Sequence, residues 1–103
     1  MQVDDQLLRC VAFVGPVAGD GAFYADGTGF FVYVEIDEHI FAYFVTAAHL
    51  VWPKRHRMEK PATAPAIRIN TSNGGFQVVR TEIEDWIFPD DHTIDMCVVS
   101  FDL

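Results

Sequence analysis

The sequence predicts an all-β domain, folded as a barrel or a sandwich, and three features of the chain support this fold class. Its apolar runs are short, they are rich in β-branched and aromatic residues, and sequences typical of turns separate them. We expect six of these runs to form strands: residues 7–14, 28–36, 40–46, 66–71, 76–83 and 96–101.

The breaks between the runs have physical causes. Gly15-Pro16 ends the first run, because proline lacks a backbone donor and restricts φ. Asp37-Glu38-His39 is expected to be a short hairpin loop, and Asn73-Gly74 is a strong hairpin signal between the fourth and fifth runs. The second run is apolar on both faces over residues 30–34, which predicts a central strand with cover on both sides.

One segment, residues 47–52, is typical of a short helical turn rather than a strand. It contains Ala and Leu, which favour helix, and Pro53 cannot continue it. Thr46 is a plausible N-cap for this turn. Residues 53–65 are then expected to form a long loop, and the basic cluster at its start is interpreted as a solvated segment. That cluster comprises Lys54, Arg55, His56, Arg57 and Lys60.

Length and charge limit the possible functions. The 103 residues suffice for a single domain, 1–103, with enough apolar material for a core. The net charge of −8 argues against nucleic acid as a partner, because binding phosphate requires a cationic surface. No run approaches the roughly 20 apolar residues of a membrane helix. The N-terminus lacks the basic start and apolar run of a signal peptide, so we expect a cytoplasmic protein unless a leader precedes these residues.

The two cysteines, Cys10 and Cys97, are too few for a disulfide framework. Each lies in an apolar run, so we expect buried free thiols in a reducing compartment. Either thiol could be a nucleophile, but neither lies in a cationic or helix-N-terminal context that would lower its pKa. Packing in the core is therefore the favoured role for both.

Two segments carry a recognisable pattern. Gly27-Thr28-Gly29-Phe30-Phe31 is followed by Phe44-Val45-Thr46-Ala47-Ala48-His49, and Ile94-Asp95-Met96-Cys97-Val98-Val99 comes later in the chain. This combination resembles trypsin-like peptidases of the chymotrypsin fold, in which a G-[TS]-G-F strand precedes a strand that ends in V-T-A-A-H. The resemblance covers nearly the whole chain and corresponds to the N-terminal barrel of that family.

The resemblance implies a six-stranded antiparallel Greek-key β-barrel with a short helical turn at residues 47–52. It implies that His49 is the general base of a Ser-His-Asp triad and that Asp95 orients it, with a polypeptide as the substrate and no cofactor or metal. In such a triad, imidazole takes the proton of a poorly nucleophilic serine hydroxyl, and the carboxylate holds the imidazole in the required tautomer.

The chain departs from the family in its nucleophile. Ser72 and Ser100 are the two serines, and neither lies in the G-[DN]-S-G-G context of the family. Ser72 is better explained by a hairpin turn. We therefore expect the serine, the oxyanion donors and the specificity pocket to belong to a second barrel encoded after residue 103. The family's bridging cysteines and its I-V-G-G-type N-terminus are also absent, which favours a bacterial, phage or other intracellular subfamily.

Simpler interpretations exist for the same residues. His49 could be an ordinary histidine, and Asp95 could cap the start of a strand. Asp90, Asp91, His92 and Asp95 could hold a hard cation, but calcium-loop spacing is missing and a solvated acidic turn is favoured. His39 and His56 are interpreted as exposed loop residues.

Two further functions remain open. The chain could be a non-catalytic β-barrel interaction module derived from a peptidase fold, with an exposed apolar face that binds a partner. A second chain could also supply the nucleophile to His49 and Asp95 in trans.

Overall fold

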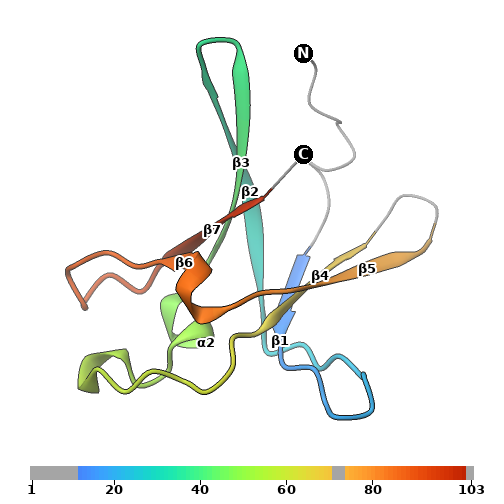
Figure 1. The fold of residues 1–103 in the computed structure, drawn as a ribbon, viewed down its shortest axis with the longest axis vertical. Helices are drawn as coiled ribbons and strands as arrows, with labels where there is room; N and C mark the ends of the chain where they lie inside the picture. The colour runs from blue at the N-terminus through green and yellow to red at the C-terminus, as the bar shows by residue number, and fades with distance from the viewer. Residues whose placement is uncertain (1–11, 71–73, 102–103) are drawn as a thin grey trace.

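The computed structural model describes residues 12–70 and 74–101, which form one curled antiparallel sheet resembling half of a barrel (Figure 1). Its order is β5-β4-β1-β2-β3-β7-β6, so β5 and β6 are the two edges. The seven strands are β1 (Ala12–Gly15), β2 (Gly27–Ile36), β3 (His39–Thr46), β4 (Ala66–Asn70), β5 (Phe76–Arg80), β6 (Trp86–Ile87) and β7 (Cys97–Phe101). The prediction of a mostly antiparallel β fold is confirmed.

The strand count of six is corrected to seven within the described residues. The additional strand is β6, which is too short to produce a periodic pattern in the sequence. The fifth run, expected to reach residue 83, ends at Arg80 because a 3₁₀ turn, η2 (Ile83–Asp85), follows it. Glu82 and Asp85 close this turn as a capping box. The first run is described only from residue 12 and the fourth only to residue 70, and the remainder of each lies outside the described residues.

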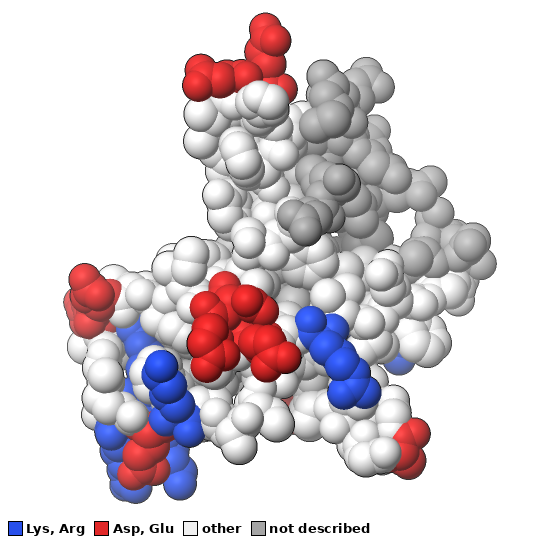
Figure 2. All heavy atoms as spheres, viewed as in Figure 1, with Lys and Arg blue, Asp and Glu red and all other residues white. Residues whose placement is uncertain are grey.

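The β2–β3 hairpin turns over two residues rather than the expected three. Asp37 and Glu38 have φ values of 50° and 66°, and His39 already belongs to β3, where it pairs with Ile36. Two left-handed residues are characteristic of the turn whose twist matches paired strands. The hairpin rises beyond the rest of the sheet to an acidic tip (Figures 1 and 2).

Strand β2 is central in the sheet, as predicted, but it is covered on one face rather than on both. Alternate side chains of a strand point to opposite faces, and those of Phe30, Val32, Val34 and Ile36 are exposed on the outer face. On the inner face, the Phe31 ring makes edge contacts with Phe44 and Phe101 at centroid distances of 5.2 and 5.3 Å. Within residues 12–70 and 74–101, the apolar pattern on both faces of β2 therefore does not correspond to a second layer.

The core lies on the concave side of the sheet. Val14, Phe44, Ile67 and Cys97 are fully buried there, and Trp86 of β6 packs its ring against Phe44. A four-residue helix, α2 (Ala48–Val51), closes one end of the core by burying Ala48 and Val51. No helix in the described part of the chain is long and apolar enough to cross a membrane.

Gly29 is required where β2 crosses Phe44. A Cβ atom at this position would lie 2.3 Å from Phe44 Cζ and 2.5 Å from the carbonyl oxygen of Val45. We expect Gly29→Ala to lower the free energy of unfolding by about 1–3 kcal/mol through overpacking. Urea unfolding followed by circular dichroism measures this change. The matched control is Gly19→Ala, where an added Cβ meets no atom within 4 Å. Equal unfolding midpoints for the two variants would contradict the assignment.

Candidate functional site

The end of β3 and the short helix after it position His49. β3 ends at Thr46, Ala47 is extended, and α2 begins at Ala48, which agrees with the helical turn predicted at residues 47–52. The prediction of Thr46 as the N-cap is wrong, because Ala47 occupies that position. The Thr46 hydroxyl instead donates a hydrogen bond of 2.8 Å to the carbonyl oxygen of Thr28, which ties β3 to β2.

Strand pairing brings Asp95 to His49. Thr46, the last residue of β3, pairs with Cys97, the first residue of β7. His49 follows this pair by three residues along one chain segment and Asp95 precedes it by two along the other. The antiparallel register therefore places both side chains at the same end of the two strands.

Both oxygens of the Asp95 carboxylate contact His49. Oδ2 lies 2.6 Å from the imidazole Nδ1, and Oδ1 accepts a hydrogen bond of 2.8 Å from the backbone N–H of His49. An ionised carboxylate only accepts, so Nδ1 is the donor and Nε2 of the neutral ring is left as an acceptor. The two side chains are 64% and 54% exposed, so the pair lies open on the surface of the described residues.

The pKa of Asp95 is lowered from its ordinary value of 3.8. The main cause is the hydrogen bond from the His49 side chain, followed by the backbone bond from the same residue. A further backbone bond from Ala48 acts in the same direction. The carboxylate therefore stays ionised throughout the neutral pH range and keeps the imidazole oriented.

Cys97 is buried and is not a suitable nucleophile. Burial raises the pKa of its thiol to about 12, so the thiol is protonated at neutral pH. Its Sγ lies 3.9 Å from the carbonyl oxygen of Ala47, directly beneath the start of α2. The prediction of a buried free thiol is confirmed for Cys97, whereas Cys10 lies outside the described residues.

The serines do not complete a triad within the described residues. Ser100 is in the middle of β7, where it pairs with Tyr43, and His49 has no hydrogen-bond partner among the described residues other than Asp95. Ser72 lies outside the described residues.

The acidic stretch before Asp95 is organised locally. The Asp91 carboxylate accepts bonds from the hydroxyl and the backbone N–H of Thr93, at 2.6 and 2.9 Å, and these bonds lower its pKa. The residues that the structure describes contain no cluster of three or more His, Cys, Asp or Glu side chains suited to a metal.

Arg55 is the residue that the sequence interpretation missed. Within the basic cluster, Lys54, His56, Arg57 and Lys60 are exposed, as expected of a solvated loop, but Arg55 is only 6% exposed. Figure 2 shows a group of Lys and Arg side chains at the lower left, over the segment after α2, and a separate blue group nearer the centre. No sequence signal separates Arg55 from its neighbours. His56 lies in a 3₁₀ turn, η1 (Arg55–Arg57), and exposed His39 lies in β3 rather than in a loop.

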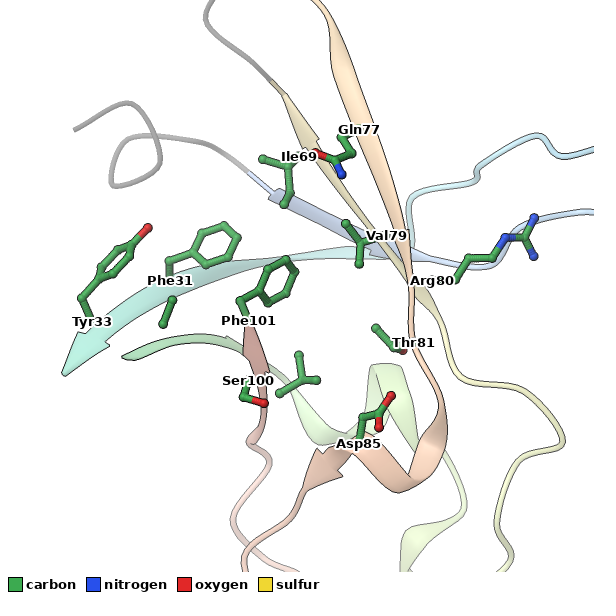
Figure 3. Close-up of a pocket in the computed structure, with 12 residues that line it drawn as sticks. Phe31, Tyr33, Ile69, Gln77, Val79, Arg80, Thr81, Asp85, Ser100 and Phe101 are labelled. Atoms are coloured by element: carbon green, nitrogen blue, oxygen red, sulfur yellow. The ribbon is translucent and has the colours of Figure 1, made fainter. Parts of the chain in front are cut away.

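A pocket of about 660 Å³ opens on the concave side of the sheet, away from the His49–Asp95 pair. Figure 3 shows Phe31, Val79 and Phe101 at its apolar floor, with Gln77 and Thr81 among the polar residues around it. Neither His49 nor Asp95 lines this pocket. It is the hollow between the two edges of the half-barrel.

No family model, no curated protein and no solved structure matches the chain.

The Asp95 carboxylate should titrate below 3.8 because of its bonds to His49. In ¹³C NMR of the side-chain carboxyl, we expect His49→Ala to raise the midpoint towards 3.8, while His56→Ala leaves it unchanged. Because folding lowers the pKa of Asp95, its ionised carboxylate adds to the free energy of unfolding at pH values above its ordinary pKa. This contribution is lost as the pH falls through the folded-state pKa. The contribution should be small, since both groups are more than half exposed. Equal midpoints in the wild type and His49→Ala would contradict the geometry.

The Cys97 thiol should resist alkylation in the folded chain. Thiolate is the reactive form, and a pKa of about 12 leaves little of it at pH 8. In a Cys10→Ser background, we expect iodoacetamide to modify Cys97 at least tenfold more slowly without urea than with it, as followed by mass spectrometry. Equal rates in the two conditions would show that Cys97 is accessible and reactive.

Proposed function

We propose that this chain is the N-terminal barrel half of a trypsin-like serine peptidase, with His49 as the general base and Asp95 as the residue that orients it. The observation that carries the proposal is the double contact between the Asp95 carboxylate and the imidazole and backbone of His49. A solvated surface pair needs no such arrangement, whereas a general base needs a fixed tautomer and a fixed ring direction.

The proposed chemistry follows from the ring atoms. With Nδ1 engaged by Asp95, Nε2 takes the proton of a serine hydroxyl as its oxygen attacks the scissile carbonyl. The imidazolium that forms is stabilised by the ionised Asp95 and then gives its proton to the leaving amine. The serine and the oxyanion donors are contributed by residues outside this sequence, from a second barrel encoded by the same gene or carried by a second chain.

The order of the strands supports the same proposal. In the sheet, β4 lies beside β1, which is compatible with the Greek-key arrangement that we propose, in which a fourth strand returns to lie beside the first. His49 follows the third strand, β3, and Asp95 lies two residues before β7, the strand that pairs with β3. The resemblance to trypsin-like peptidases implies a His after the third strand and an Asp at the start of the sixth; here Asp95 precedes the seventh strand, because β6 is additional. Because a fold does not specify a reaction, the argument depends on the pair rather than on the sheet.

The exposure of the pair is consistent with a site shared between two bodies. In the described residues, water reaches both side chains, which weakens their electrostatic interaction. A second barrel and a bound polypeptide covering this surface would exclude that water and strengthen the interaction.

A non-catalytic interaction module is the second candidate function, and one observation favours it. The outer face of the β2–β3 hairpin exposes an apolar row formed by Phe30, Val32, Val34, Ile36 and Phe41. Exposed apolar surface of this kind is characteristic of interaction sites.

A fluorophosphonate probe tests the proposal on the protein expressed from the full reading frame that contains these residues. We expect the wild type to be labelled at a serine outside residues 1–103. His49→Ala should abolish labelling, and Asp95→Asn should slow it by roughly 10⁴-fold because the imidazole then adopts the wrong tautomer.

His56→Ala is the matched control, since His56 is an exposed histidine in the 3₁₀ turn after α2. It should be labelled at the wild-type rate. A folded wild-type protein without any labelled serine would refute the peptidase proposal and favour the interaction module. Labelling that survives His49→Ala would remove His49 as the base.

A further inference from the structure

Arg55 is a buried cation whose guanidinium donates hydrogen bonds to backbone carbonyl oxygens. Its Nη1 donates a hydrogen bond of 3.1 Å to the carbonyl of Ile94, and its Nη2 donates to the carbonyls of Asp91, at 3.1 Å, and Pro89. Arg55 forms no ion pair with a carboxylate in the described ranges 12–70 and 74–101. Burial of a charge is costly unless polar groups satisfy it, so these carbonyls compensate for water that the guanidinium has lost.

All three carbonyls belong to the loop that leads into Asp95. The Ile94 carbonyl is part of the peptide group that joins Ile94 to Asp95, so its bond to Nη1 restrains the backbone of Asp95 directly. The other two contacts hold the loop further upstream. Arg55 thus restrains residues 89–94 as a unit.

Arg55 is also joined to the segment that carries His49. The backbone N–H of Arg55 donates to the Trp52 carbonyl at 3.2 Å, and the backbone N–H of Trp52 donates to the Ala48 carbonyl at 2.8 Å. Between the two segments lies Phe88, whose ring centroid is 5.5 Å from Arg55 Cζ and 5.3 Å from the Trp52 ring centroid. The end of α2 and the Asp95 loop are therefore joined through one cluster: Trp52, Arg55 and Phe88.

We propose that Arg55 is a positioning residue for the His49–Asp95 pair, because its guanidinium holds residues 89–94 in the conformation that presents the Asp95 carboxylate to His49. This inference rests on the proposed function, since it adds a residue to the same site. Arginine suits the role because its rigid planar fork carries five donors and can serve several carbonyls at once. Lysine offers only a compact point charge on a flexible stem.

A purely structural role is separable from a positioning role. If Arg55 only fills space, an apolar side chain of similar length should leave the His49–Asp95 contact intact in a folded chain. The pKa of Asp95 reports the difference, because hydrogen bonds from His49 and Ala48 lower it. Arg55→Lys keeps the positive charge, so a rise of that pKa in this variant reports altered geometry.

The test compares Arg55→Met, Arg55→Lys and the control Arg57→Met, which alters an exposed arginine of the same 3₁₀ turn. The readouts on the 103-residue chain are the downfield Nδ1–H proton resonance of His49 and the ¹³C titration of the Asp95 carboxyl. We expect Arg55→Met to lose the resonance and raise the Asp95 midpoint towards 3.8. Arg55→Lys should recover these signals only in part, and Arg57→Met should match the wild type.

Wild-type signals in a folded Arg55→Met or Arg55→Lys chain would overturn the proposal. The wild-type chain provides a second test that does not depend on either variant folding. Its Arg55 Nη–H protons should exchange with solvent at least tenfold more slowly than those of Arg57, and equal exchange would also overturn the proposal. These readouts concern the pair itself, so a failure of serine labelling would refute the proposed function without affecting them.

Discussion

The pairing of β3 with β7 is the constraint on which the site depends. Thr46 and Cys97 are paired in this ladder. After Thr46 the chain continues into α2, and Cys97 is preceded by the loop that contains Asp95. A shift of one residue in the register would turn every side chain of the shifted strand to the opposite face and move His49 away from Asp95. The buried side chains of Phe44, Cys97 and Val99 oppose such a shift, because each would leave the core.

Register alone leaves the loop before Asp95 undetermined. Residues 88–96 contain no regular strand, so their conformation depends on individual hydrogen bonds. Asp91 and Thr93 form one local turn, and the buried guanidinium of Arg55 supplies the long-range contacts. The position of His49 is therefore determined by the strands. The position of Asp95 also depends on a side chain from another loop.

The outer face of the β2–β3 hairpin lies outside the core. Its apolar side chains contribute nothing to the concave core, and yet the hairpin extends well past the strands that flank it (Figure 1). Under the peptidase proposal this face and the exposed His49–Asp95 pair are two surfaces of an incomplete assembly. Under the alternative, the hairpin face is the functional surface and the pair is a remnant.

Sequence patterns sufficed to predict the mostly antiparallel β fold, the helical turn around His49 and the two residues of the candidate pair. These features follow from local physics, namely period-two patterns, turn residues and a proline stop, together with a recognisable motif. The seventh strand, the one-sided cover of β2 and the burial of Arg55 could not be predicted, because each depends on the three-dimensional fold. β6 is stabilised by its pairing with β7. Phe30 is exposed because no layer of the described residues covers it. Arg55 is buried by a loop that lies more than thirty residues further along the chain. Such long-range contacts leave no mark in the neighbouring sequence.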